Sequence, residues 1–217
     1  MRQRYVKNQD EILENSDKYI SNPKELKGIW KKKGYSKLHI EIGMGKGTFI
    51  STLAMQNPDI LYVGIEVCKP VLALAIKKIA RFEEDNNIKL NNLFLLDSDA
   101  KTLSDVFETG EVDKIYLNFS DPWPKKKHAK RRLTSDEFLD VYRNILSKEA
   151  DIEFKTDNRK LFEYSLLNLN KNNVNMTYIS LDLHKEEDIF NVVTEYEEKF
   201  SKLGPIYKVV FDFKENK

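Results

Sequence analysis

The sequence predicts an α/β fold: a Rossmann-like, doubly wound and mostly parallel seven-stranded sheet with an antiparallel strand near one edge. From residue 37 onward, short apolar runs alternate with stretches of helical periodicity, which favours parallel strands joined by helices. The last two apolar runs have no helix of usual length between them, so we expect the final run to pair antiparallel at or near an edge. The chain has 217 residues, which suits one such domain with a modest extension.

The individual elements follow from these runs. Strands are expected at residues 38–42, 61–66, 93–96, 115–119, 152–155, 176–183 and 207–213. Helices are expected at residues 48–56, 70–83, 135–146 and 159–170. Pro70 suits the first turn of the second helix, where a missing backbone amide costs nothing. Thr134 and Ser135 are the two candidates for the N-cap of the third helix.

The remaining composition limits where the protein works and what it binds. No apolar run approaches the roughly 18 residues that a membrane helix needs, and the N-terminus lacks the apolar segment of a signal peptide. Cys68 is the only cysteine, which excludes an internal disulfide or a cysteine-built zinc site. We expect Cys68 to be a small buried residue, His39 to be structural, and no histidine to bind metal. A reducing, cytoplasmic location is the simplest expectation.

The charges are unevenly distributed. Residues 125–132, called the basic segment below, contain six lysines and arginines and no acid. The net charge is +1, and without those six cations the chain would carry 30 basic against 35 acidic residues. This asymmetry indicates contact with a polyanion at a defined place, although a solvated basic loop is an equal alternative on this evidence alone.

A glycine-rich loop follows the first strand, where residues 41–48 read Glu-Ile-Gly-Met-Gly-Lys-Gly-Thr. The glycines at 43, 45 and 47 allow a tight turn and the close approach of a ligand. A phosphate-binding P-loop needs a serine or threonine after its lysine, but Gly47 follows Lys46, so that class fails. A dinucleotide would place its pyrophosphate beside Glu41, which would repel it. S-adenosylmethionine carries an ammonium and a sulfonium but no phosphate, and an acid suits that charge pattern.

Two further acids end the next two strands. Glu66 follows the second strand, where a carboxylate can accept two hydrogen bonds from ribose hydroxyls. Asp99 follows the third strand, where an adenine edge would be contacted. Each acid alone is more often a solvated loop carboxylate. Three acids at the carboxyl ends of neighbouring strands instead predict an S-adenosylmethionine site, because ligands of such sheets bind at that edge.

The loop after the fourth strand, residues 118–124, reads Asn-Phe-Ser-Asp-Pro-Trp-Pro. Pro122 and Pro124 are expected to hold Asp121 and Trp123 in extended conformations. A rigid loop of this kind beside a methyl donor can hold a planar base, although a stiff turn with Trp123 packed inward is the alternative. The basic segment follows at once, so phosphate contacts would lie next to a base pocket. An enzyme that acts on RNA needs phosphate contacts of this kind beside the pocket that takes the base.

The central stretch resembles the signature of the bacterial tRNA (guanine-N7-)-methyltransferase family. Residues 118–126 read Asn-Phe-Ser-Asp-Pro-Trp-Pro-Lys-Lys, and residues 128–134 read His-Ala-Lys-Arg-Arg-Leu-Thr. The glycine loop, Phe-Lys-Thr-Asp-Asn at 154–158, Thr-Glu-Tyr-Glu at 194–197 and the Arg-x-Arg start agree with the same family. The resemblance covers nearly the whole chain. It departs at 148–150, where Lys-Glu-Ala stands in place of expected glycines and leaves the turn before the fifth strand in question.

This resemblance implies the residues of a tRNA-modifying enzyme that uses S-adenosylmethionine and needs no metal. The implied catalytic residue is Asp121, which would orient the base and offset charge rather than accept a proton. The implied donor-binding residues are Glu41, Gly43, Gly45, Gly47, Glu66, Asp99 and Asp121. The implied substrate-binding residues are Lys125, Asp157, Thr194, Glu195, Tyr196 and Glu197. The implied RNA-contacting residues are Lys127, His128, Ala129, Lys130, Arg131 and Arg132.

The expected domains are an N-terminal extension at 1–36, helical and irregular, and a methyltransferase domain at 37–217. Arg2 and Arg4 form either an arm that orders on tRNA or a disordered tail. Asp157 precedes a predicted helix and could simply cap it. Three rival functions are considered: a methyltransferase acting on another base or on protein nitrogen, a catalytically silent tRNA-binding scaffold, and an NAD oxidoreductase, which the glycine spacing and Glu41 already disfavour. No membrane contact and no obligate protein partner are expected.

Overall fold

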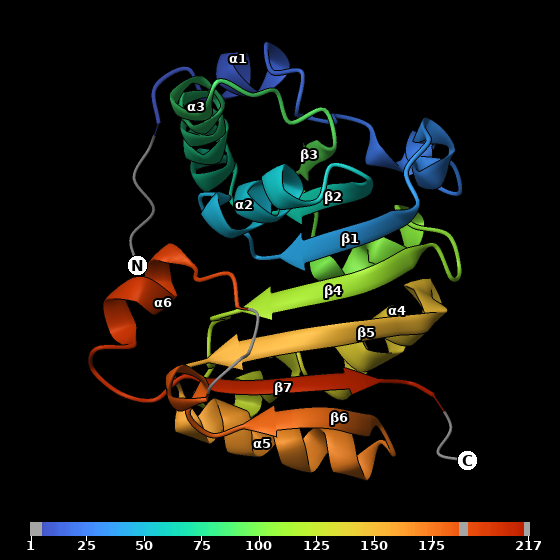
Figure 1. Ribbon diagram of the computed structural model, residues 1–217. Helices are drawn as coiled ribbons and strands as arrows, with labels where there is room; N and C mark the ends of the chain where they lie inside the picture. The colour runs from blue at the N-terminus through green and yellow to red at the C-terminus, as the bar shows by residue number, and fades with distance from the viewer. Residues whose placement is uncertain (1–5, 187–190, 215–217) are drawn as a thin grey trace.

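The computed structural model describes residues 6–186 and 191–214, and these residues form one seven-stranded sheet flanked by helices (Figure 1). The strands are β1 Lys37–Ile42, β2 Ile60–Ile65, β3 Leu93–Leu96, β4 Val112–Asn118, β5 Leu146–Thr156, β6 Asn175–Ser180 and β7 Tyr207–Asp212. Their order across the sheet is β3-β2-β1-β4-β5-β7-β6. The predicted fold class is therefore confirmed, with every expected strand found.

The strand pairing shows at which edge of the sheet a ligand can bind. Strands β3, β2, β1, β4 and β5 are parallel, whereas β7 runs antiparallel between β5 and β6. The antiparallel strand was expected near an edge, and it lies one position inside it. The chain runs outward from β1 to β3 and then returns to β4 on the other side of β1. This reversal is a switch point, where crevices open at the carboxyl ends of the strands.

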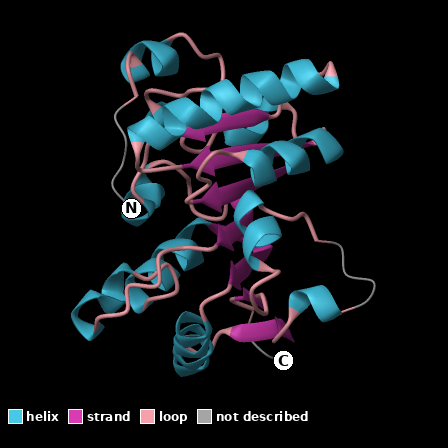
Figure 2. Ribbon diagram, turned by 90° about the vertical axis from the view of Figure 1, so that its left-hand side faces the viewer, coloured by secondary structure: helices cyan, strands magenta, loops and turns pink. Residues whose placement is uncertain are grey.

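Helices cover both faces of the sheet (Figure 2). The α-helices are α1 Gln9–Glu14, α2 Thr48–Gln56, α3 Lys69–Asn86, α4 Asp136–Ile145, α5 Arg159–Lys171 and α6 Glu195–Phe200. Because successive strand residues face opposite ways, β2 supplies Leu61 and Val63 to one core and Tyr62 to the other. The first core is completed by α4 and α5, and the second by α2 and α3.

Three details differ from the sequence-based expectation. Helix α6 was not predicted, because its six residues are mostly charged; a capping box in which Thr194 and Glu197 satisfy each other's backbone amides starts it. Strand β6 ends at Ser180, not at 183. Strand β5 begins at Leu146, directly after α4, so residues 148–150 form part of a strand instead of a turn. The register shift between β4 and β5 accommodates them without glycine.

The described part of the N-terminal extension packs into the domain. Trp30 is fully buried, and its indole nitrogen donates to the carbonyl of Val106. The buried Glu111 carboxylate accepts from the backbone amides of Gly28 and Trp30. Tyr19 pairs with β3 through an isolated parallel bridge. Arg2 and Arg4 lie outside the described residues, so the arm and the division at residue 36 stay predictions.

Gly64, in the middle of β2, offers a stability prediction. A Cβ added there would lie 2.3 Å from Met44 Sδ and 3.1 Å from Leu95 Cδ2. We expect Gly64→Ala to lower the free energy of unfolding by about 1–3 kcal/mol, the usual cost of overpacking a core. Gly204→Ala is the matched control, because a Cβ there meets nothing within 4 Å. Equal urea unfolding midpoints for the two variants would contradict this explanation of the packing.

Candidate functional site

A pocket of 580 Å³ lies at the carboxyl ends of β1, β2, β3 and β4, within the usual size of a small-molecule site. It brings together residues from five separate loops or strand ends. Its lining includes Gly43, Glu66, Asp99, Asn118, Phe119, Asp121, Trp123, Arg131 and Phe138. The sequence-predicted acids at 66, 99 and 121 thus share one cavity, called the first pocket below.

A second pocket of 240 Å³ adjoins it. The two share Gly43, Asn118 and Phe119 in their linings. The remaining wall comes from the glycine loop, from Phe49 on α2, and from the start of α6. Its lining residues are Glu41, Gly43, Met44, Gly45, Lys46, Gly47, Thr48, Phe49, Asn118, Phe119, Thr194, Glu195 and Tyr196. A ligand in one pocket can therefore meet a ligand in the other across these shared residues.

The glycine loop joins the two pockets. Gly43, Gly45 and Gly47 all have left-handed backbone angles, with φ of 75°, 57° and 76°. A Cβ on Gly43 or Gly45 would meet no atom within 4 Å, so their surfaces are open to a ligand. A Cβ on Gly47 would lie 3.1 Å from Ile79 Cδ1, so this glycine also permits close packing of α2 on α3.

Glu66 is fixed beside that loop. Its two carboxylate oxygens accept from the amides of Gly45 at 3.2 Å and Cys68 at 3.0 Å. Burial raises the pKa of Glu66, those amides oppose the rise, and the nearby charge of Asp121 adds to it. The carboxylate is held rigidly at the rim of the first pocket, where hydroxyl groups of a ligand can reach it.

Glu41 is a buried acid near the end of β1. The residue is 2% exposed, and Oε1 accepts from Asn118 Nδ2 at 2.9 Å. Its Oε2, Asn118 Oδ1 and Thr48 Oγ1 are buried without a hydrogen-bond partner among the described residues. Burial raises the pKa of Glu41 to about 8. Buried acceptors without donors are costly, so this cluster fits a ligand that brings a positive charge or N–H donors.

Asp99 and Asp121 occupy exposed ends of the first pocket. Asp99 caps a short 3-10 helix at Ala100–Asp105, and its Oδ1 accepts from the amide of Lys101 at 2.9 Å. Its second carboxylate oxygen makes no hydrogen bond within the described part of the chain. Asp121 has no hydrogen-bond partner among the described residues, so its carboxylate is free to meet a ligand.

The 118–124 loop does not take the expected shape throughout. Trp123 was expected to be extended, but its φ is 41°, in the left-handed region. Arg132 explains the turn: its guanidinium donates to the carbonyls of Pro122 at 3.1 Å and Trp123 at 2.9 Å, and it also stacks on Tyr164. The Trp123 ring is half-buried and lines the first pocket, so it is not packed into the core.

The basic segment forms a 3-10 helix at Lys126–Arg131. Its lysines are exposed, whereas Arg131 lies over the Trp123 ring at 4.8 Å and lines the first pocket. His128 also packs near that ring, with centroids 5.7 Å apart. Arg132 is occupied inside the protein by the bonds just described. The segment thus presents cations beside the pocket while two arginines hold the pocket wall.

The predicted substrate residues separate into two groups. Thr194, Glu195 and Tyr196 line the second pocket, and the Tyr196 hydroxyl donates to Asp157 Oδ2 at 3.2 Å. Asn158 caps α5, because its side chain accepts from the amide of Leu161, so Asp157 is not needed as a cap. Lys125 is exposed outside both linings.

Glu197 lies apart from both linings. It is fully buried and is engaged by Lys155, His184, Asn191 and Thr194. Sequence reasoning also missed Asn118 and Phe119, which both pockets share. The signal available for Asn118 was a polar residue at the end of a buried strand.

Comparison with known proteins identifies the family. A model of a family described as putative methyltransferases matches residues 35–209. The chain is 50% identical to the tRNA (guanine-N(7)-)-methyltransferase of Bacillus subtilis, over 99% of this chain and 100% of that protein. The chain belongs to the bacterial tRNA (guanine-N7-)-methyltransferase family. The family member of Listeria monocytogenes is also 50% identical, over 91% of each chain. The predicted family is confirmed.

Solved structures agree on the fold. The crystal structure of the 16S rRNA (adenine(1408)-N(1))-methyltransferase from Catenulisporales acidiphilia matches with a TM-score of 0.62, over 90% of this chain and 94% of that one. A structure of a mutant of that enzyme with the cosubstrate SAM gives a TM-score of 0.60, over 90% and 94%. Both are 14% identical, which supports the shared fold alone.

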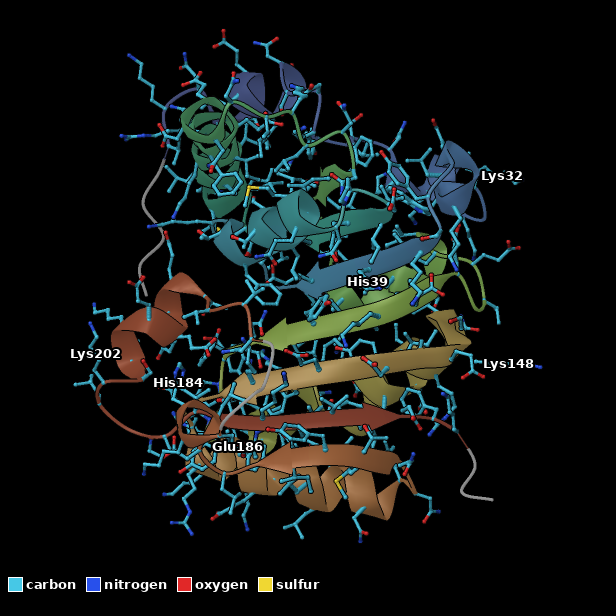
Figure 3. The ribbon with its side chains drawn as sticks, viewed as in Figure 1. Lys32, His39, Lys148, His184, Glu186 and Lys202 are labelled. Atoms are coloured by element: carbon cyan, nitrogen blue, oxygen red, sulfur yellow. The ribbon has the colours of Figure 1, made fainter. Side chains whose placement is uncertain are left out.

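The remaining chemistry-bearing residues take structural places. His39, on β1 (Figure 3), is buried between Tyr62 and Tyr116, and burial lowers its pKa to about 4. Cys68 is a buried free thiol, as expected. Among the described residues, no cluster of His, Cys, Asp and Glu could hold a metal ion. No helix in this part of the chain combines the length and apolar character of a membrane span.

Proposed function

We propose that this protein transfers a methyl group from S-adenosylmethionine to N7 of a guanine in the variable loop of tRNA. The proposal rests on two adjoining pockets that share Gly43, Asn118 and Phe119. The basic segment lies beside them. The first pocket suits the nucleoside part of the donor, and the second suits both the cationic end of the donor, at Glu41, and an edge of the base, at Thr194 and Glu195. Relatives that are about half identical carry the matching name.

S-adenosylmethionine fits the acids present. It supplies a methyl group on a positively charged sulfonium, together with an ammonium, a ribose and an adenine. We assign Glu66 to the ribose hydroxyls and Asp99 to the adenine edge. The partnerless acceptors around Glu41 suit the ammonium end, and the open faces of Gly43 and Gly45 leave room for it. No metal ion enters this scheme.

Methylation of guanine N7 requires mainly that the protein position the guanine and the methyl donor. Guanine N7 carries an in-plane lone pair and no proton, so no general base is required. The protein must align N7 with the methyl group and sulfur in a line, which is catalysis by orientation. The guanine ring gains positive charge as the bond forms. Asp121 has no other partner among the described residues, so we assign it to orienting the base and stabilising that charge.

The guanine edge is assigned to the second pocket. Its N1–H and amino group are donors, and carboxylates or hydroxyls suit them. We assign this contact to Thr194 and Glu195, which line that pocket, and to Asp157, which accepts from the neighbouring Tyr196 hydroxyl. Glu195 is also paired with Lys78. Lys125 and residues 127–131 are assigned to the tRNA backbone, whereas Arg132 supports the 118–124 loop from within. We also propose a catalytic unit at 37–217, a tRNA contact at the start of the 1–36 extension, and a cytoplasmic location.

Donor binding should depend on pH through Glu41. Its pKa in the free protein is raised by burial to about 8, and a bound cation favours the ionised form. Below that pKa, binding must release a proton, so affinity should rise by up to about tenfold per pH unit from pH 6 and level off near pH 8. Calorimetry in two buffers measures the released proton. Glu41→Gln should remove its share of the release; unchanged release in that variant would contradict the assignment.

The function is tested by methyl transfer itself. The protein is incubated with isotope-labelled S-adenosylmethionine and unmodified tRNA, and the digested nucleosides are identified by mass spectrometry. The expected product is 7-methylguanosine in the variable loop. Methyl on another atom would refute the base assignment but leave the donor site intact. Tight tRNA binding without transfer would favour a binding scaffold.

A further inference from the structure

We propose that the buried ion pair of Lys155 and Glu197 is a positioning device that fixes the Thr194–Tyr196 wall of the second pocket. This inference rests on the proposed function, because it concerns how the acceptor base is held. Both side chains are completely buried, and Lys155 Nζ lies 2.7 Å from Glu197 Oε2. Lys155 lies near the end of the sheet strand β5, and Glu197 lies in the first turn of α6, so the pair ties a short helix to the sheet.

All three ammonium protons of Lys155 go to one stretch of chain. They are donated to Asn191 Oδ1 at 3.0 Å, the Val192 carbonyl at 3.1 Å and Glu197 Oε2 at 2.7 Å. The ammonium also lies 5.0 Å from the centre of the Phe49 ring, which lines the second pocket. Lys155 therefore has no donor left for a ligand. Its contacts hold Asn191, Val192 and Glu197 at the end of β5.

The Glu197 carboxylate is equally committed. Oε1 meets His184 Nε2 at 3.0 Å and accepts from Asn191 Nδ2 at 2.6 Å. Oε2 accepts from the Thr194 amide at 3.3 Å as well as from Lys155. Burial alone would raise the pKa of Glu197, but the charge and hydrogen bonds of Lys155 hold it below its usual value. His184, labelled in Figure 3, thus joins the same network.

The network controls the residues that face the pocket. The Thr194 hydroxyl accepts from the Glu197 amide, which sets the start of α6. That start places the Tyr196 ring between Phe119, at 4.9 Å, and Phe200, at 4.0 Å between ring centroids. Phe119 belongs to both pockets. A shift of Glu197 would therefore move the wall against which the base must lie.

Stability alone does not explain such a pair. Replacing both members of a buried ion pair together with hydrophobic side chains of similar volume is often neutral or stabilising, whereas removing one partner is strongly destabilising. A short helix of six residues also gains little from its own length. The charges instead favour one arrangement of the two side chains, in which each ammonium proton of Lys155 has an acceptor. Positioning of the pocket wall is the role that uses that geometry.

The test compares two double variants. Lys155→Met with Glu197→Gln removes both charges, and glutamine still suits the capping-box position. The control is Lys18→Met with Glu83→Gln, which removes another buried pair, 2.9 Å apart, whose members line neither pocket. Three quantities are measured on each: the KM for tRNA together with kcat, the Kd for S-adenosylmethionine, and hydrogen exchange of the amides of residues 194–200. Because the single variant Lys155→Met leaves the Glu197 charge buried without its partner, it should unfold at a lower urea concentration than the double variant.

For the 155/197 variant we expect the KM for tRNA to rise by about tenfold or more, with amides 194–200 exchanging faster. The donor Kd is measured well above the pKa of Glu41, because the Lys155 charge lowers that pKa, and it should be unchanged within about twofold. The control should leave all three unchanged. Wild-type KM and exchange in the 155/197 variant would overturn the proposal, and so would an equal loss of donor affinity. If the wild-type protein did not methylate tRNA, the proposed function would fail. The exchange of residues 194–200 would then decide the positioning role separately.

Discussion

Asp121→Ala is expected to lower kcat for methyl transfer by about 100-fold or more, the usual loss when a group that stabilises transition-state charge is removed. The carboxylate lines the first pocket and has no other partner among the described residues, so its charge is available to the reacting base. The Kd for S-adenosylmethionine should change much less, because Glu41 and Glu66 remain. Single-turnover methyl transfer with saturating donor and tRNA measures the loss.

Asp140→Ala is the control for that variant, since Asp140 is an exposed aspartate on α4 outside both pocket linings. It should keep full activity. Because Asp121 is not assigned as a proton acceptor, the single-turnover rate of the wild-type protein at saturating donor and tRNA should show no steep acid limb near neutral pH. Near-normal turnover by Asp121→Ala would remove the residue from the catalytic scheme.

Lys127→Ala with Lys130→Ala is expected to weaken tRNA binding on the order of tenfold at physiological salt, by removing two phosphate contacts. Both lysines are exposed on the basic segment. The dependence of the logarithm of affinity on the logarithm of salt concentration should become shallower by about 2, because each lysine that neutralises a phosphate adds roughly one to the slope. Fluorescence titration of labelled tRNA at several salt concentrations measures both quantities.

Lys32→Ala with Lys148→Ala removes the same charge elsewhere. Both lysines lie at the opposite end of the strands from the carboxyl ends that form the pockets (Figure 3). This control should bind tRNA nearly as the wild type does. An equal loss of affinity and salt dependence in both double variants would mean that total charge, and not the basic segment, governs binding.

The sheet and the donor side of the site were predictable from sequence because they follow from local patterns. Short apolar runs locate the strands, and parallel strands bring their carboxyl ends to one edge. Glu66, Asp99 and Asp121 each follow a strand closely, so their meeting in one cavity required only the order of strands. No long-range contact had to be known in advance.

The acceptor side was less predictable because it depends on contacts between distant segments. The place of Glu197 is decided by Lys155, 42 residues away, and by His184. Arg132 looks like an exposed cation in sequence but holds the 118–124 loop through two carbonyls. Trp123 is turned out of the extended region by that contact, which overrides the local preference of a residue before proline. The capping box at 194–197 was a readable signal for α6.

The central claim, that N7 is the atom methylated, is tested most directly by removing that atom from the substrate. A tRNA is prepared with 7-deazaguanine at the variable-loop position that the protein modifies, leaving the base-pairing edge unchanged. We predict that this tRNA binds as tightly as the unmodified one and receives no methyl group. Methyl transfer at the normal rate to the 7-deazaguanine tRNA would contradict the claim.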